Sequence, residues 1–296
     1  MKVSNMLLKQ IIIDSTVEIL RRSATKLPKP VMDAMVEIKN TTNDEGALLQ
    51  IQNIVDDAFL AMEESKPMCQ DTGIISFTIE VGDHFPFKSE LKDILKEATI
   101  QATTDIPLRP NVVDFFNGNS GNNIDSRGFL PYFYIDLIPG NDVKITAMTK
   151  GGGSSNVSKL GMLKPGLGLK GALQFVIETV AEAGPSGCPP YRVGVGIGGG
   201  EDICMTLAKK SLLKPIGYRN TDHKIAELEE ALMKACNELP IGPMGVGAGK
   251  TVIDVNINLA GRHPASLPVG VVLSCWALRH SSVKITAEGD VEFTEY

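Results

Sequence analysis

The length, composition and charge of the chain exclude several classes of protein. It has 296 residues, of which 43% are hydrophobic and 22% are charged, as in an ordinary globular protein with a full core. Its formal net charge is −6, and the sequence has no long basic run. This charge balance argues against a surface that binds nucleic acid, so we expect no nucleic-acid partner.

The sequence also argues against export and membrane insertion. Residues 1–20 are interrupted by charges such as Lys9 and Asp14, which does not fit a signal peptide. No apolar stretch in the sequence is long enough to span a bilayer, so we expect no membrane partner. Five cysteines, an odd number without an export signal, favour reduced thiols over a disulfide framework. We therefore expect a cytoplasmic protein.

The N-terminal third is predicted to be mostly helical. Apolar residues recur at helical spacing over Met6–Leu20, Val31–Ile38 and Ala47–Met62. A β-branched strand is expected at Ile74–Val81 and a further helix at Leu91–Thr103. The lobe formed by the first helices should cover about residues 1–66.

Strands and helices are expected to alternate in the rest of the chain. After a loop at residues 117–123, two strands, Tyr132–Ile138 and Val143–Met148, are joined by the turn Pro139–Asp142. The elements expected after them are a helix, a strand, two helices and two strands, at 168–183, 191–197, 201–213, 222–239, 252–259 and 269–274. The predicted fold is α/β with mixed β-sheets and a helical N-terminal lobe, in a single domain over residues 1–296.

Three cysteines, Cys69, Cys188 and Cys275, stand at positions typical of loops. An iron–sulfur cube has four iron atoms to ligate, so three thiolates would leave one iron open to polarise a substrate oxygen. Cys204 and Cys236 fall inside predicted helices with apolar neighbours and should be buried. A structural zinc or redox-sensing site in a non-enzymatic subunit remains an alternative, although zinc usually takes four ligands, often in close pairs.

Two glycine-rich motifs resemble nucleotide sites. Gly194–Gly199 matches the G-x-G-x-x-G pattern, but the next helix begins with Glu201 and Asp202, where a pyrophosphate would have to bind. Gly245–Thr251 resembles a P-loop, but Met244 replaces its first glycine and a strand follows. A tight strand-to-helix turn is the better interpretation of the first motif, and we reject nucleotide binding at the second.

Three further features suit an anionic ligand, each with a structural alternative. Lys150–Asn156 contains three glycines that would let backbone N–H groups approach an anion, or would form a flexible loop. Arg109, between two prolines, would clamp a carboxylate or lie on the surface. His263 follows a strand end and is either solvated or catalytic.

Taken in order along the chain, these motifs resemble the class I (iron–sulfur) fumarate hydratase family. The resemblance is to its separate α subunit, whose close cousin is the α subunit of L-tartrate dehydratase. It covers nearly the whole chain and rests on an ordered set of motifs, at residues 69–73, 108–111, 150–154, 188–190, 241–245, 262–264 and 275–276. Any one of these motifs is weak, but the ordered set is specific.

The resemblance implies a cofactor and a set of site residues. The implied cofactor is a [4Fe-4S] cluster, and its implied ligands are Cys69, Cys188 and Cys275. The residues implied to bind substrate are Gln70, Arg109, Gly152 and Gly153. The residues implied to move a proton are Asp71 and His263. Residues 117–123 depart slightly from the family pattern, which affects only that loop.

The implied reaction is the reversible hydration of fumarate to L-malate. Residues 151–156 and 108–111 look fumarase-like, because tartrate dehydratases tend to carry a cysteine after the glycines and a histidine in place of Pro110. The alternatives are L-tartrate and related hydroxy-diacids. Single-chain members of the family carry a further domain with more cationic contacts and the base. We therefore expect a β subunit in an α2β2 enzyme, and without that subunit we expect this chain to be catalytically incomplete.

Overall fold

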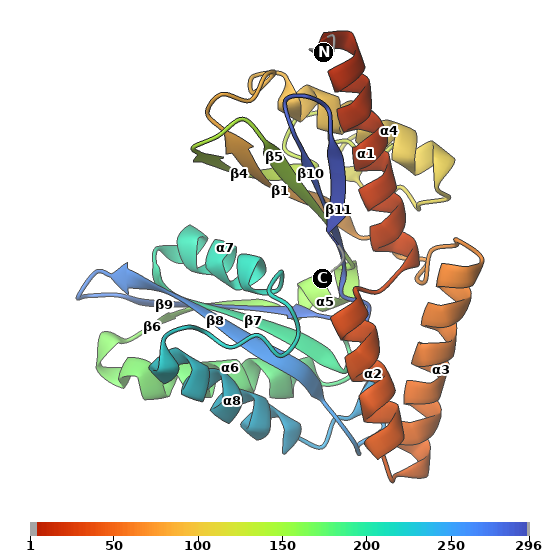
Figure 1. Cartoon of the computed structure of the whole chain (residues 1–296). Helices are drawn as coiled ribbons and strands as arrows, with labels where there is room; N and C mark the ends of the chain where they lie inside the picture. Colours follow the sequence, from red (N-terminus) through yellow and green to blue (C-terminus); the bar gives the residue numbers. More distant parts are fainter. Residues whose placement is uncertain (1–4, 295–296) are drawn as a thin grey trace. The chain divides into compact units, whose positions relative to one another are not determined.

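The computed structural model describes residues 5–294 of the chain, which form two compact units (Figure 1). The first unit comprises the chain up to Lys29, residues 57–151 and the chain from Arg279 onward. The second unit comprises residues 30–56 and 152–278. Each unit has a hydrophobic core of its own. The chain passes between the units four times, and two of these crossings, Gly151–Gly152 and Leu278–Arg279, lie beside predicted site residues.

The elements agree closely with the expected pattern of helices and strands. The α-helices are α1 (Asn5–Thr25), α2 (Lys29–Thr41), α3 (Glu45–Glu63), α4 (Leu91–Asp105), α5 (Gly152–Asn156), α6 (Gly168–Ala183), α7 (Glu201–Ser211) and α8 (His223–Asn237). The strands are β1 (Ile74–Gly82), β2 (Val113–Asp114), β3 (Gly118–Asn119), β4 (Tyr132–Ile138), β5 (Val143–Lys150), β6 (Lys159–Leu163), β7 (Tyr191–Gly199), β8 (Val252–Arg262), β9 (Leu267–Ser274), β10 (Arg279–Ile285) and β11 (Val291–Thr294).

The first unit is built on a five-stranded mixed sheet in the order β11-β10-β5-β1-β4. β1 pairs in parallel with β4 and antiparallel with β5, so it lies between the two strands joined by the Pro139–Asp142 turn. Those two strands therefore do not form a hairpin. α1 packs against β5, β10 and α4, and its buried side chains recur at helical spacing, for example Leu8, Ile12 and Ile19.

Strand β4 forms one edge of this sheet and pairs, among the described residues, only with β1. Several of its apolar side chains remain exposed: 42% of Ile135 and 67% of Leu137 are accessible to solvent. The loop before it carries the exposed Phe129. The first unit thus has an open, apolar strand edge.

The second unit is built on a four-stranded mixed sheet in the order β6-β9-β7-β8. α7 covers one face, and α6 and α8 cover the other (Figure 1). Because both faces are covered, β9 is buried along its whole length, as expected for a continuous apolar strand. Each strand of this sheet can therefore hold the residues at its ends in fixed positions.

The glycines of the G-x-G-x-x-G motif serve helix packing in this structure. A Cβ on Gly194 would lie 2.1 Å from the carbonyl oxygen of Ala208, and one on Gly196 would lie 2.0 Å from that of Cys204. Both oxygens belong to α7, so the glycines let this helix lie directly on β7. This agrees with a strand-to-helix turn. The P-loop-like segment leads into β8 as expected.

The predicted fold class is confirmed: the structure has mixed sheets, helices and a helical N-terminal region. No helix among residues 5–294 combines the length and the apolar character needed to cross a membrane. The elements that were not expected are the short helix α5, the two-residue strands β2 and β3, and strands β6, β10 and β11. The expectation of a single domain over residues 1–296 stays a prediction.

Candidate active site

In the first unit, the loop Cys69–Gly73 precedes β1 and presents three predicted site residues. Cys69 and Asp71 are half-buried and Gln70 is exposed. The loop is anchored at its start by the buried Met68, whose N–H donates to the carbonyl of Ala24 at 3.0 Å. At its end, Gly73 has φ 78°, and a Cβ there would lie 2.1 Å from the carbonyl oxygen of Lys150. Only glycine fits that position.

Hydrogen bonds from its own loop and from two distant segments of the first unit hold Asp71. Its Oδ1 accepts from the N–H of Gly73 and from the Asn111 side chain, both at 2.8 Å. Its carbonyl accepts from the guanidinium of Arg279 at 2.7 Å. The carboxylate and the backbone of Asp71 are therefore fixed independently.

Arg109 is linked to the same loop through its backbone. Its N–H donates to the hydroxyl of Thr72 at 2.8 Å, and its carbonyl accepts from Asn123 at 3.3 Å. Its side chain is exposed, and within the described residues the guanidinium makes no hydrogen bond or ion pair. The first unit thus places an accessible guanidinium on a backbone tied to the Asp71 loop.

In the second unit, Cys188 and Cys275 lie at the same end of the sheet. Cys188 stands three residues before β7, Cys275 directly follows β9, and Arg192 pairs with Ser274 in the antiparallel register of these strands. The carbonyl of Cys188 accepts from the N–H of Trp276 at 3.1 Å. We call this end of the second sheet the cysteine end. It holds two partly exposed thiols.

The turn that carries Cys188 is stabilised by Tyr191. The Tyr191 hydroxyl accepts from the N–H of Gly187 at 2.9 Å and donates to the carbonyl of Gly184 at 2.7 Å. Cys188 itself has φ 58°, a conformation that non-glycine residues seldom adopt. Burial raises the pKa of Tyr191 to about 12, and the neighbouring Cys188 and Cys275 add to the rise. The hydroxyl therefore stays protonated and keeps both bonds.

Gly152 and Gly153 form the first turn of α5 and are exposed. A Cβ on Gly153 would lie 3.3 Å from the carbonyl oxygen of Ser186, so this glycine lies against the Cys188 turn. α5 also contacts β9, the strand that ends before Cys275. The expected loop is helical here, and it belongs to the cysteine end.

His263 lies at the other end of the same sheet. It follows β8, whose last residue, Arg262, pairs with Gly199 at the end of β7. β7 has nine residues, and the eight steps between them, at about 3.3 Å each, separate the two ends by about 26 Å. His263 is exposed, and its Nδ1 accepts from the N–H of Ala265 at 3.1 Å. The structure therefore does not bring His263 to Cys188 and Cys275 of the same chain.

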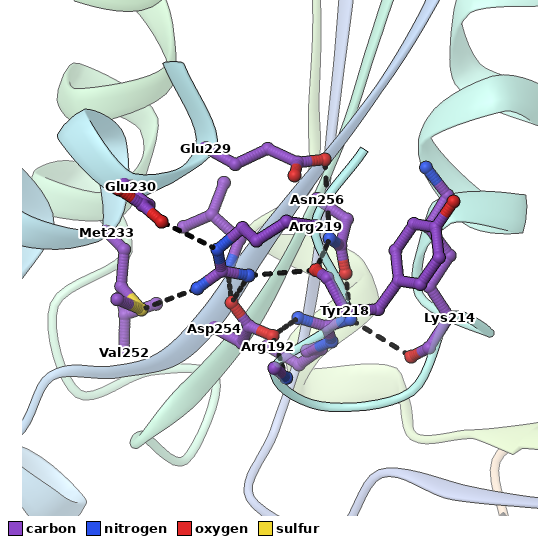
Figure 2. A network of polar contacts seen from close by, with 12 residues as sticks. Arg192, Lys214, Tyr218, Arg219, Glu229, Glu230, Met233, Val252, Asp254 and Asn256 are labelled. Atoms are coloured by element: carbon purple, nitrogen blue, oxygen red, sulfur yellow. Dashed lines mark hydrogen bonds and ion pairs between the residues drawn. The ribbon is translucent and has the colours of Figure 1, made fainter. Parts of the chain in front are cut away.

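A buried network of charges supports the strands of the cysteine end (Figure 2). Arg192 and Asp254, 0% and 1% exposed, form an ion pair at 2.9 Å between β7 and β8. Asp254 also accepts from Arg219 at 2.8 Å, and Arg192 donates to Asn256. Burial lowers the pKa of Arg192, and the adjacent Asp254 opposes this effect. The network fixes the register of the strand that follows Cys188.

Among residues 5–294, no three side chains of His, Cys, Asp or Glu are grouped as a metal site. The candidate ligands are divided between the units, with Cys69 in the first and Cys188 and Cys275 in the second. Cys204 and Cys236 are buried in helices α7 and α8, as the sequence predicts. The exposed and buried cysteines are thus clearly distinguished.

Comparison with known families decides the affiliation of the chain. The model of the family described as fumarate hydratase (fumerase) matches residues 13–284. The chain belongs to the fumarate hydratase family. This confirms the resemblance found in the sequence, and it identifies the chain as a member of a family of hydro-lyases.

Several relatives of this chain are named as tartrate dehydratase subunits. A putative L(+)-tartrate dehydratase subunit alpha of Methanocaldococcus jannaschii is 40% identical over 281 residues, which cover 92% of this chain and 96% of the relative. The L(+)-tartrate dehydratase subunit alpha of Escherichia coli strain K12 is 36% identical over 267 residues, covering 90% and 88%. The same figures apply to that of Shigella sonnei strain Ss046.

Sequence reasoning missed three residues that shape the site of this family member. Thr72 and Asn111 lie within recognised motifs, but their contacts with Arg109 and Asp71 span 37 and 40 residues of sequence. Arg279 reaches Asp71 across 208 residues. Its position four residues after Cys275 was the available signal, since a lone arginine beside a candidate metal ligand suits an anion.

Proposed function

We propose that the chain is the α subunit of a two-subunit [4Fe-4S] hydro-lyase that reversibly hydrates fumarate to L-malate. The proposal rests mainly on the cysteine end, where two partly exposed thiols are held on adjacent strand ends in a member of the fumarate hydratase family. A thiolate pair in this position suits a soft metal centre better than a packing role.

The donor set fits an iron–sulfur cluster. Cys69, Cys188 and Cys275 are partly exposed on turns and would hold the cluster, whereas the other two cysteines are buried. Three thiolates would leave one iron for substrate. When bound, the cluster would supply a Lewis acid for the hydroxyl that leaves malate as water, an effect worth several kcal/mol.

The first unit would supply groups for binding and proton transfer. The exposed guanidinium of Arg109 would pair with a substrate carboxylate, and Gln70 would donate to a substrate oxygen. Asp71, oriented by Asn111, would deliver the proton that turns the leaving hydroxyl into water. Backbone N–H groups of Gly152 and Gly153 would support a further oxygen.

Two groups would come from other chains of an α2β2 assembly. A β subunit would supply the base that removes the carbon-bound proton of malate. His263, at the far end of the sheet from Cys188 and Cys275, would act in the site of the second α chain. Because the ligand set requires reduced thiols, we place the enzyme in the cytoplasm.

L(+)-tartrate is the second candidate substrate, since the relatives of this chain carry tartrate dehydratase names. Loss of water from tartrate gives the enol of oxaloacetate, so the chemistry at the hydroxyl-bearing carbon is the same as with malate. The fumarase-like motifs at residues 108–111 and 151–156 favour fumarate.

The test is anaerobic purification of the chain together with the proposed β subunit, reconstitution with iron and sulfide, and assay of each substrate. We expect fumarate absorbance to rise with L-malate only when both subunits are present. Oxaloacetate from L(+)-tartrate, with no reaction of malate, would replace fumarate by the second candidate. A pair that binds no iron would refute the hydro-lyase itself.

A further inference from the structure

A short hairpin in the first unit presents two phenylalanine rings to solvent. Strands β2 and β3 pair antiparallel, and the turn between them carries Phe115 and Phe116, which are 99% and 86% exposed. Phe129, in the segment that leads to β4, is 70% exposed. We call these three residues the aromatic tip. Single exposed apolar side chains are common, but several large ones in one segment mark a surface that binds a partner.

Polar contacts hold the aromatic tip in a fixed conformation. Oδ1 of Asp114 accepts from the N–H of Phe116 at 2.8 Å, and its Oδ2 forms an ion pair with Arg127 at 3.2 Å. The guanidinium of Arg127 lies 5.5 Å from the centre of the Phe116 ring. In the same turn as Arg127, Asp125 accepts from the N–H of Phe129 at 3.1 Å. Because the tip is already ordered, a partner that binds it loses little affinity to loop ordering.

The exposed aromatic surface is large enough to form the centre of a protein interface. A phenylalanine side chain offers about 150–250 Å², so the exposed fractions of the three rings amount to about 400–600 Å². The largest apolar patch of an ordinary monomer covers a similar area and is often functional. Each partner of a stable complex contributes about 800 Å², so the tip would supply at least half of its side.

The hairpin lies close to the proposed substrate-binding residue Arg109. The side chain of Asn119, in β3, donates to the carbonyl of Pro110 at 2.7 Å, which ties the hairpin to the Arg109 segment. Phe115 follows Arg109 by six residues, which span no more than about 22 Å even when fully extended. A chain bound to the aromatic tip would therefore lie beside a group that we propose to bind substrate.

The β subunit suits this surface better than a second copy of the chain does. Two rings that project from a turn need an apolar recess in their partner. Two cavities of this chain are instead lined mainly by polar groups: one includes Thr42 and Lys250, and the other includes Asn117 and Ser120. The relatives of similar length are named as alpha subunits, and the proposed function supplies a partner of different sequence.

We propose that the aromatic tip is the docking site of the β subunit, which would present an apolar recess to Phe115 and Phe116. This inference rests on the proposed function, because it takes the β subunit from it. Docking at the tip would bring the base supplied by the β subunit close to the substrate carboxylate paired with Arg109. It also gives a reason for the exposure of the rings, which assembly would cover.

The test compares Phe115→Ala, Phe116→Ala and the double variant in the reconstituted chain. Ile100→Ala is the matched control, because it removes an exposed apolar side chain, 43% accessible, from α4 of the same unit. Four quantities are measured: the Kd for the β subunit by calorimetry, the mass of the chain alone by light scattering, its melting temperature, and kcat at saturating β subunit.

We expect each single variant to raise the Kd for the β subunit about 10- to 30-fold, and the double variant to raise it about 100-fold or more. The melting temperature should stay unchanged, because the Phe115 ring is almost fully exposed and backbone and polar contacts hold the turn. At saturating β subunit kcat should be normal, since neither ring contacts substrate. Ile100→Ala should bind as the unmodified chain does.

Three outcomes would overturn the inference. The first is an unchanged Kd in the double variant, and the second is an unmodified chain that binds no β subunit. The third is a double variant that loses self-association while its Kd for the β subunit is unchanged, which would assign the tip to a second copy. If the assembled complex turns over no hydroxy-diacid, the proposed function fails, and the Kd values still decide where the β subunit docks.

Discussion

The two units hold their candidate site residues in different ways. In the first unit, the Cys69–Gly73 loop is fixed by side chains from distant segments, Asn111 and Arg279. In the second, Cys188 and Cys275 are fixed by backbone hydrogen bonds and a tyrosine hydroxyl, on strands locked by a buried ion pair. The polar groups that we propose to bind substrate therefore lie in the first unit, and a rigid pair of thiols lies in the second.

The largest expected effect comes from the thiols. Replacing Cys69, Cys188 or Cys275 by serine should abolish iron binding and activity together, because a serine hydroxyl is a poor ligand for iron in a sulfur-ligated cluster. The matched control is Cys236→Ser, since that thiol is buried in α8. Iron analysis and the visible spectrum of the anaerobic complex measure the result. A fully active Cys69→Ser protein would remove the basis of the assignment.

Asp71→Asn tests the proposed role of the first unit in proton transfer. It should leave the iron content unchanged and lower kcat by about 10²- to 10⁴-fold, the usual contribution of a proton-transfer group.

His263→Ala should lower kcat as well. If His263 serves the second α chain, a mixed complex of Asp71→Asn and His263→Ala chains should recover activity, because one of its two sites is intact. Failure of the mixture to recover would place both residues in one chain's site.

Asp254→Asn tests whether the buried ion pair stabilises the sheet of the second unit. It leaves the fully buried Arg192 without its counter-ion, so the chain should lose about 3–5 kcal/mol of unfolding free energy. The midpoint of urea unfolding measures this. As a control, Asp142→Asn breaks the surface ion pair with Lys284 and should leave the midpoint unchanged. Equal midpoints for the two variants would show that the network does not stabilise the sheet.

Tyr191→Phe should have a smaller effect, confined to the Cys188 turn. It removes the partner of the Gly187 N–H and the donor to Gly184, which costs about 1–3 kcal/mol. Cys188 of the cluster-free chain should then react faster with iodoacetamide, while Cys275 serves as the internal reference. Tyr132→Phe, at an exposed position, is the control. An unchanged rate at Cys188 would mean that the backbone alone holds the turn.

The smallest effect concerns alkaline pH. Burial raises the pKa of Cys236 from its ordinary value of 9.0 to about 12. Above pH 9 the unfolded chain therefore loses this proton while the folded chain keeps it, so stability is lost as pH rises towards 12. Unfolding midpoints measured between pH 8 and pH 11 should fall less steeply in Cys236→Ala.

The sequence predicts much of this architecture, because helical spacing in α1 and the apolar run of β9 are local signals. It does not predict that β1 inserts between β4 and β5, since a turn signal does not say which strands pair. For the candidate site, too, local features can be predicted from the sequence and long-range contacts cannot. The position of Cys275 after a buried strand is readable, whereas the contact of Arg279 with Asp71 depends on the tertiary fold. The separation of His263 from Cys188 likewise follows from sheet register alone.

The open edge at β4 has a practical consequence. Among the described residues β4 pairs with a strand on one side only, and such an edge with exposed apolar side chains, such as Leu137, is a template for further strands. When this chain is produced alone and in excess, we expect aggregation to begin at β4, with monomers adding edge to edge. A lysine at Leu137 would place a charge on that edge and should keep the overproduced chain in solution, as measured by the fraction that remains after centrifugation.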